Sequence, residues 1–388
     1  MHRAGQKEID AIARVIRGHK LFRYGQGNQC DRFERRYARY LGVKHVCLAP
    51  SGSAALSAAL AGLGIGPGDE VIVPAHTYMA TAASVLAVGA IPVIVDIDES
   101  ITLDPKAFES AIRARTRAVM PAHMWGLVCD MKAILRIARR HKLLVVEDAC
   151  QCIGGAYEGR LVGSLGHAGA FSFNFYKNIT CGEGGAIVTN DDRVAERALC
   201  MIDGCRYYWT GRKGDFVPFV SNGSRASEIE GAMLNVQLDR LPAMIRELRR
   251  RKKKILRDTA DTGLRPNPVH SPDHECATTL MYLLPTARHA EHFAQGVGCG
   301  IAGKTGRHTY NEWDAILTHE GAHHPALDPF KLPQNRRCRM TYHKDMCPRS
   351  LDILGRTVMI GLSPNFTAAE VRALTRKIRK AAKEVLGS

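Results

Sequence analysis

Short apolar runs alternate with helical stretches through the first half of this 388-residue chain. The apolar runs lie at 70–74, 91–96, 118–121 and 143–148, and the helical stretches at 53–63, 77–88 and 131–141. Apolar runs of strand length with helices between them are typical of a mostly parallel sheet covered by helices. The sequence therefore predicts an α/β fold, and a chain that is 45% hydrophobic can bury the core that this fold needs.

The pattern changes after residue 245. The elements expected there are a long basic helix, a loop rich in proline and histidine near 267–274, a strand at 279–284 and a final helix at 367–386. We therefore predict a large domain over 1–245, which includes an N-terminal helical segment, and a smaller C-terminal α+β domain over 246–388.

The net charge of +16 comes in large part from one run, 246–254. Apolar residues at helical spacing continue through this run, and no aromatic side chains lie between the basic ones. This pattern favours a solvated helix face over a nucleic-acid interface, which would need stacking side chains. We predict no nucleic-acid partner, although the positive charge can attract anionic substrates.

No apolar run reaches the roughly 18 residues of a membrane span. Met1 to Gly5 lead into a charged helical pattern without a signal-peptide core. The 12 cysteines are scattered in a chain too long to need disulfide staples, which favours reduced thiols. We therefore expect a cytoplasmic protein with no membrane partner. Cys150 and Cys152 are too closely spaced for a zinc knuckle, so no metal site is predicted.

Lys177 is the candidate nucleophile of the chain. It lies among aromatic and small residues, between an apolar run that ends at Phe173 and a glycine turn at 182–185. Desolvation favours the neutral form of an amine, and a neutral amine forms an imine with an aldehyde or ketone. Lys177 is therefore predicted to form a Schiff base.

Three other clusters lie at the ends of predicted strands, where open parallel sheets bind ligands. Ser51-Gly52-Ser53 opens a helix whose free N–H groups attract phosphate, although a plain N-cap has the same sequence. Asp148 ends a buried strand, as either a ligand contact or a helix cap. Tyr78 follows another strand, either to stack on a flat ligand or to pack in the core. For each cluster alone, both interpretations stay open.

Together with Lys177, these clusters match pyridoxal 5'-phosphate. Its phosphate suits the Gly52 turn, and its ring face suits Tyr78. Its pyridine nitrogen suits the Asp148 carboxylate, which keeps that nitrogen protonated and makes the ring an electron sink. Its aldehyde suits Lys177. We therefore predict this cofactor, with Asp148 and Lys177 as the catalytic residues.

These residues belong to longer motifs. The motifs lie at 22–25, 51–56, 64–74, 147–151, 171–173, 177–178 and 182–185. In this order they resemble the DegT/DnrJ/StrS family of sugar aminotransferases over most of the chain. The resemblance implies fold type I of the pyridoxal phosphate-dependent transferases, with a mostly parallel sheet in the large domain.

The resemblance also implies roles for individual residues. Gly52 and Ser53 would bind the cofactor phosphate with help from Ser172, and Gln151 would contact the phenolic oxygen. Asn222 resembles an asparagine whose loop reaches the phosphate held by the neighbouring subunit. An obligate homodimer with a shared active site is therefore implied.

The chain departs from the family pattern near the substrate. Asn174-Phe175-Tyr176 stands where relatives often have Pro-Thr or Pro-Gly, and Asn222 lies three places before Arg225 where relatives have two. Lys177 argues against the relatives that carry histidine there and act as sugar dehydratases. The segments 22–24 and 123–126 resemble relatives that aminate the terminal carbon of an octulosonate.

The predicted reaction is transamination. An amino-acid donor, glutamate or glutamine according to the resemblance, leaves as a 2-oxo acid while Lys177 moves the proton. The amino group then passes to a keto or aldehydo sugar, a sugar acid or a cyclitol. Two alternatives stay open: an enzyme of the same fold and cofactor that catalyses carbon–carbon bond formation or elimination, and a non-catalytic binding or regulatory protein.

Overall fold

A central sheet organises the computed structural model, which describes residues 4–211 and 216–387. Its strands are β1 (His45–Ala49), β2 (Glu70–Pro74), β3 (Ile91–Val95), β4 (Thr116–Val119), β5 (Leu144–Asp148), β8 (Ala168–Ser172) and β9 (Gly185–Thr189). They lie in the order β1-β9-β8-β5-β4-β2-β3. Residues 1–3, part of the segment 1–5 on which the expectation about the start of the chain rested, lie outside the described residues.

Strand pairing confirms the predicted mostly parallel sheet. From β3 through β2, β4 and β5 to β8 the neighbours are parallel, whereas β9 runs antiparallel to both β8 and β1. Every residue of β2 and β3 is buried. Strands covered on both faces need continuous apolar sequence, which is why these runs were visible in the sequence.

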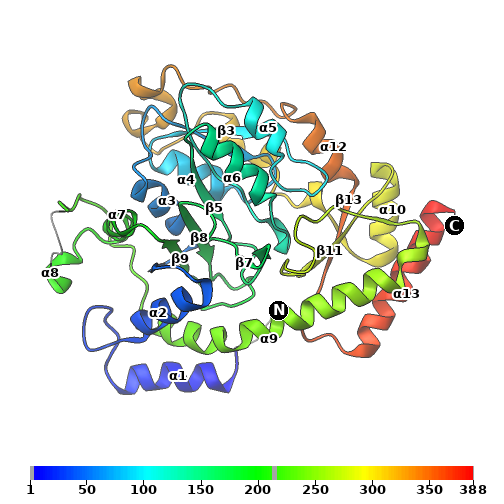
Figure 1. Ribbon diagram of the computed structural model, residues 1–388, viewed down its shortest axis with the longest axis horizontal. Helices are drawn as coiled ribbons and strands as arrows, with labels where there is room; N and C mark the ends of the chain where they lie inside the picture. The colour runs from blue at the N-terminus through cyan, green and yellow to red at the C-terminus, as the bar shows by residue number, and fades with distance from the viewer. Residues whose placement is uncertain (1–3, 212–215, 388) are drawn as a thin grey trace.

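Helices cover both faces of this sheet (Figure 1). The helices of this part of the chain are α1 (Gln6–Arg17), α2 (Gln29–Leu41), α3 (Gly52–Gly62), α4 (Ala80–Ala87), α5 (Pro105–Ser110), α6 (Met131–Arg140), α7 (Asp192–Ile202), α8 (Tyr207–Thr210) and α9 (Glu228–Asp258). Val145 packs with α2, α6 and α9 on one face, and Val146 packs with α3, α4 and α7 on the other. In the described part of the chain, no helix is both long and apolar enough to span a membrane.

A second, antiparallel sheet lies in the C-terminal part. Its strands β10 (Arg265–Pro266), β11 (Thr279–Leu283), β13 (Thr357–Gly361) and β12 (Gly300–Ile301) are neighbours in that order. The helices beside it are α10 (Ala287–Val297), α12 (Pro348–Arg356) and α13 (Ala368–Leu386). Helix α9 runs from one sheet to the other and crosses position 245 without a break (Figure 1). The predicted division at 245/246 stays a prediction.

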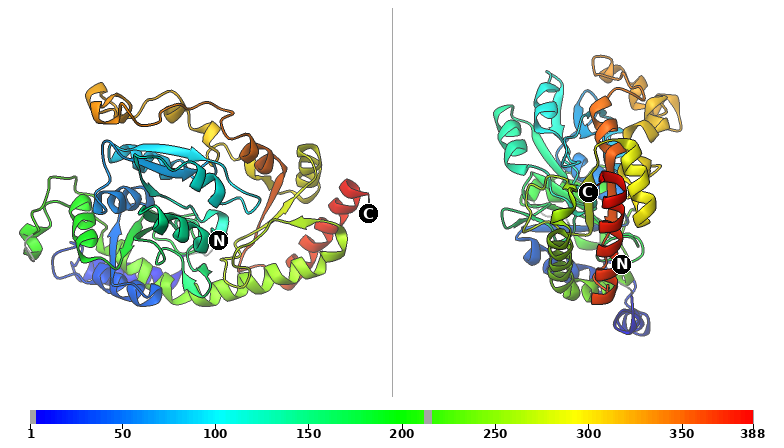
Figure 2. Two further views of the ribbon diagram at one scale, coloured as in Figure 1. Left: turned by 45° about the horizontal axis from the view of Figure 1, so that its top comes forward. Right: turned by 90° about the vertical axis from the view of Figure 1, so that its right-hand side faces the viewer.

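The segment between β12 and α12 returns to the large sheet (Figure 2). It contains the short helix α11 (Asp314–Leu317), and its Tyr310 and Trp313 are buried in the core cluster that covers β2 and β3. The Arg339 guanidinium forms an ion pair with the buried Glu70 carboxylate at 2.5 Å. This return segment, residues 302–347, therefore packs against the first sheet, although it connects β12 of the second sheet to α12 beside that sheet.

The basic run in α9 is less solvated than its sequence suggests. Lys252 is buried and forms an ion pair with Glu275 at 2.7 Å. Arg249 donates hydrogen bonds to the backbone carbonyls of His274 and Glu275 at 2.6 and 2.7 Å. These contacts use part of the run to hold the chain before β11 against α9.

Candidate active site

A cavity of about 680 Å³ lies at the carboxyl ends of the parallel strands. Its lining includes Gly52, Ser53, Tyr78, Asp148, Gln151, Ser172 and Lys177. These are seven of the eight predicted site residues, and they lie at the ends of β5 and β8 or in the segments that follow β1, β2, β5 and β8. The remaining walls are formed in part by Trp125, Thr278, Arg307 and His308.

The Gly52 turn begins α3. The Ser51 hydroxyl accepts a hydrogen bond from the Ala54 N–H at 3.1 Å, so Ser51 is the N-cap, and Gly52 and Ser53, which open the helix, line the cavity. A Cβ atom on Gly52 would lie 2.8 Å from the Ser172 Cβ and 3.0 Å from the Cys150 Sγ. Only glycine leaves this close approach open, which makes the turn suitable as a phosphate cradle.

Asp148 ends β5 and is 6% exposed at the cavity. One carboxylate oxygen accepts a hydrogen bond from the Thr81 hydroxyl at 2.6 Å. The other accepts from the Cys150 N–H at 3.1 Å. These two donors fix the orientation of the carboxylate, so Asp148 can present a negative charge to a cationic ring nitrogen.

Lys177 lies in the loop between β8 and β9. Its backbone N–H donates to the Asn174 carbonyl at 2.9 Å, and the backbone N–H of Phe175 donates to the Gly182 carbonyl at 2.8 Å. Phe175 and Tyr176 are 56% and 72% exposed, so the aromatic neighbours in sequence do not enclose the half-buried lysine. Within the described residues its ammonium has no hydrogen bond or ion pair, which leaves the amine available in the cavity.

Aromatic and histidine side chains form another wall of the cavity. Tyr78 is 47% exposed, and its ring centre lies 5.8 Å from that of His308, which lies 4.6 Å from the Trp125 ring. The Trp125 indole N–H donates to His76 Nε2 at 3.3 Å, and His76 Nδ1 donates to the Ile101 carbonyl at 2.9 Å. Burial lowers the pKa of His76 to about 4, so a neutral imidazole accepts the indole proton.

Trp125 has the unusual backbone angle φ = 54°. Its carbonyl accepts from the Thr278 hydroxyl at 2.9 Å, and its N–H donates to Gln151 Oε1 at 3.4 Å. A non-glycine residue in this region is held there by its surroundings. Trp125 therefore connects Gln151 on the large sheet to Thr278, which directly precedes β11.

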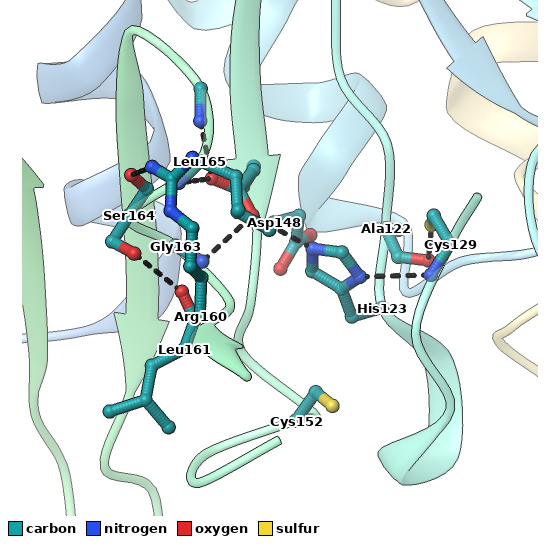
Figure 3. Close-up of polar contacts among 12 residues, drawn as sticks. Ala122, His123, Cys129, Asp148, Cys152, Arg160, Leu161, Gly163, Ser164 and Leu165 are labelled. Atoms are coloured by element: carbon teal, nitrogen blue, oxygen red, sulfur yellow. Dashed lines mark hydrogen bonds and ion pairs between the residues drawn. The ribbon is translucent and has the colours of Figure 1, made fainter. Parts of the chain in front are cut away.

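A buried polar network lies behind Asp148. The Glu147 side chain is fully buried and accepts from the N–H groups of Gly163, Leu165 and Gly166 at 2.6 to 2.8 Å. It also contacts His123 Nε2 at 3.1 Å, and Figure 3 shows the other side of this imidazole bonded to Cys129. Because successive strand residues point to opposite faces, Glu147 anchors the strand end while Asp148 faces the cavity.

Asn222 differs from the other predicted residues because it does not line this cavity. It is exposed, on the loop where Arg225 forms an ion pair with the buried Asp203 at 3.1 Å. Its predicted role concerns a neighbouring subunit and stays a prediction.

Sequence reasoning missed Thr81, Thr278 and Arg307. Thr81 could have been found as the hydroxyl one turn after Thr77 at the start of a helix. No local pattern marks Thr278 or Arg307, because long-range packing brings them to the cavity.

The cavity suits pyridoxal phosphate. Its phosphate matches the close, glycine-dependent turn at Gly52, and the Tyr78 ring and the Asp148 carboxylate in the same lining suit its ring face and its ring nitrogen. Lys177 supplies an amine in the same cavity. The described residues contain no group of three or more histidine, cysteine, aspartate or glutamate side chains that could hold a metal ion.

Fold and cavity define a class first: the α/β transferases of fold type I that depend on pyridoxal phosphate. Residues 3–299 match the model of the DegT/DnrJ/EryC1/StrS aminotransferase family. The chain belongs to this family, and the resemblance expected from its motifs is confirmed.

Several relatives illustrate the range of the family. The chain is 46% identical over 214 residues to GDP-perosamine synthase of Caulobacter vibrioides, a match that covers 54% of this chain and 56% of that protein. It is 38% identical over 287 residues to L-glutamine:2-deoxy-scyllo-inosose aminotransferase of Streptoalloteichus tenebrarius, with 71% and 67% covered. The chain spans little more than half the length of several curated relatives that it matches.

Solved structures extend the similarity along the chain. The X-ray structure of DesV of S. venezuelae in complex with a ketimine intermediate is similar with a TM-score of 0.75 and 29% identity, and the match covers 97% of this chain and 94% of DesV. The predicted fold class is therefore confirmed over almost the whole chain.

Proposed function

We propose that this protein is an aminotransferase that binds pyridoxal phosphate and transfers an amino group to a sugar-like carbonyl compound. The observation that carries the proposal is the meeting of Lys177, Asp148 and the Gly52 turn in one cavity of a family fold. Their separation in sequence makes a coincidental meeting implausible.

When bound, pyridoxal phosphate supplies an aldehyde that condenses with amines and a ring that withdraws electrons. In our proposal Gly52, Ser53 and Ser172 hold its phosphate, and Tyr78 covers its ring. The Asp148 carboxylate holds the ring nitrogen in its protonated form.

Lys177 carries out the proton transfer in this proposal. Its amine would take the proton from the α-carbon of the donor, as general base, and return it as general acid to the aldehyde carbon of the cofactor, across the nitrogen between these two carbons. Gln151 is proposed to bind the phenolic oxygen, with Trp125 holding its amide group in position.

Glutamate or glutamine is the proposed donor. The proposed acceptor is a keto or aldehydo sugar, a sugar acid or a cyclitol, as the names of a perosamine synthase and an inosose aminotransferase among the relatives suggest. A cytoplasmic location belongs to the same proposal, and twelve free cysteines support it.

A homodimer with a shared active site is also part of the proposal. Exposed aromatic side chains support it: Phe22 and Trp209 are 41% and 60% exposed and lie 5.0 Å apart between ring centres. Asp203 joins the loop that carries Phe22 to the Asn222 loop, because it accepts from the Tyr24 hydroxyl at 3.1 Å and pairs with Arg225. A second copy would cover this surface and bring Asn222 to its cavity.

The test uses the purified protein loaded with pyridoxal phosphate. Glutamate or glutamine should abolish the absorbance of the bound aldehyde form and yield the 2-oxo acid. Lys177→Ala should slow this conversion at least about 100-fold, whereas Lys132→Ala, at an exposed lysine of α6, should not. Formation of the 2-oxo acid by Lys177→Ala at the wild-type rate would contradict the proposal. Carbon–carbon bond formation or elimination without conversion of the cofactor would favour the alternative enzyme.

A further inference from the structure

The turn that carries Arg307 is attached to the end of β2. His76 and Thr309 form an antiparallel bridge, and the Thr77 N–H donates to the His308 carbonyl at 2.9 Å. Segments far apart in the sequence are thus paired like strands. This pairing places Arg307 and His308 in the lining of the cavity.

Glu312 holds the same turn from the other side. Its carboxylate accepts from the Gly306 N–H at 2.8 Å and from the His308 N–H at 3.0 Å. The Trp313 indole N–H donates to the Arg307 carbonyl at 3.4 Å. The backbone of Arg307 is therefore fixed, although its side chain is exposed.

The charged groups of the cavity are unequally partnered. Asp148 accepts two hydrogen bonds, and Glu183 accepts one from the Asn174 amide at 2.7 Å. In residues 4–211 and 216–387, the Arg307 guanidinium has no hydrogen bond or ion pair. Burial lowers the pKa of His308 to about 3, helped by nearby His76, Arg307 and Lys177, so His308 adds no positive charge.

We propose that Arg307 binds an anionic group of the substrate. The guanidinium presents paired donors that match a carboxylate or a phosphate, and Lys177 is reserved for the chemistry. The group is either a carboxylate of the amino donor or an oxyanion on the acceptor. This inference rests on the proposed function, since it assigns a binding residue to the same cavity.

Two non-reacting probes distinguish a carboxylate of the donor from an oxyanion on the acceptor. Glutarate stands for the donor carboxylates, and inorganic pyrophosphate stands for a phosphorylated acceptor. Each is titrated into the holoenzyme, and its dissociation constant is obtained from the spectrum of the bound cofactor and from the shift in melting temperature. The variants are Arg307→Ala, Arg307→Lys and, as a matched control, Arg337→Ala, which removes an exposed arginine of the return segment outside the cavity.

Arg307→Ala should weaken at least one probe about 10- to 100-fold, since hydrogen bonds to charged groups contribute about 1.5–3 kcal/mol. Arg307→Lys should recover part of the loss, and Arg337→Ala should change neither constant. Loss for glutarate alone assigns Arg307 to the donor, and loss for pyrophosphate alone assigns it to the acceptor. The inference is overturned if Arg307→Ala changes neither probe or if the wild-type protein binds neither.

Failure of this inference differs from failure of the proposed function. If glutamate converts the cofactor but Arg307→Ala leaves both probes unaffected, only the role of Arg307 is lost. If neither glutamate nor glutamine converts the cofactor but Arg307→Ala weakens a probe, the anion site stands and the aminotransferase proposal falls.

Discussion

The floor and the wall of the cavity are built in different ways. Floor residues such as Gly52, Asp148 and Lys177 lie at the end of a strand of one sheet or in the segment that follows it. The wall around His308 and Trp125 depends on contacts between the large sheet, the return segment and the chain before β11. Parallel strands bring their carboxyl ends to one edge, so a floor follows from local motifs, whereas a wall needs long-range packing.

This difference separates chemistry from specificity. In the proposed function the floor binds the cofactor and moves the proton. In the same proposal the wall contacts the substrate, through the neutral His308, the Trp125 indole and the Arg307 guanidinium. Changes to the floor should therefore reduce reaction with every substrate, and changes to the wall should discriminate among them.

The largest effect is expected for Asp148→Asn, which keeps the shape of the side chain and removes its charge. The rate of cofactor conversion by glutamate should fall about 100- to 1,000-fold, as for loss of a strong electrostatic contact to the reacting system. Pyridoxal phosphate should still bind, which its absorbance after desalting measures. Glu183→Gln removes the other carboxylate of the cavity and should have a much smaller effect; equal losses would contradict a special role for Asp148.

A second prediction concerns His76, which joins floor to wall. Its pKa is lowered to about 4 by burial, so on acidification the unfolded chain takes up this proton before the folded one. Its contribution to the free energy of unfolding is complete above the unfolded pKa of about 6.5 and decreases by about 3 kcal/mol as the pH falls to 4.

The free energy of unfolding, measured by urea unfolding between pH 7 and 4, should decrease less steeply on acidification for His76→Gln than for the wild-type protein. The exposed His292 provides the control, and His292→Gln should keep the wild-type slope. An unchanged slope for His76→Gln would show that folding does not lower the pKa of His76.

The smallest effect is expected for Gly52→Ala. The new methyl group would meet the Ser172 Cβ at 2.8 Å, so the turn must shift, at a cost of about 1–3 kcal/mol in stability. Affinity for pyridoxal phosphate should fall as well, measured by titration of the apoprotein. Gly355→Ala, in α12, meets no atom within 4 Å and should leave both quantities nearly unchanged. Equal affinity for pyridoxal phosphate in both variants would contradict the proposal that the Gly52 turn binds its phosphate.

Much of the floor could be predicted because each of its elements has a recognisable pattern within a short stretch of sequence. Fully buried β2 and β3 appear as uninterrupted apolar runs, and Asp148 is recognisable as the carboxylate that ends such a run. The setting of Lys177 was predicted less well, since Phe175 and Tyr176 turn to solvent. Their orientation depends on the hydrogen bonds of the loop, which residue types do not reveal.

By itself the sequence determined the fold class and the family, and it predicted the residues of the floor. The spacing of apolar residues, the residues that end each strand and the motifs in their order can all be read directly from the chain. Only the tertiary structure decided that Arg307 and His308 line the same cavity as Lys177, that Trp125 is bonded to both Gln151 and Thr278, and that Lys252 is buried. The physical reason is that these contacts join segments distant in sequence. Their geometry is set by how the return segment and α9 pack on the sheets, and no single stretch of sequence contains that information.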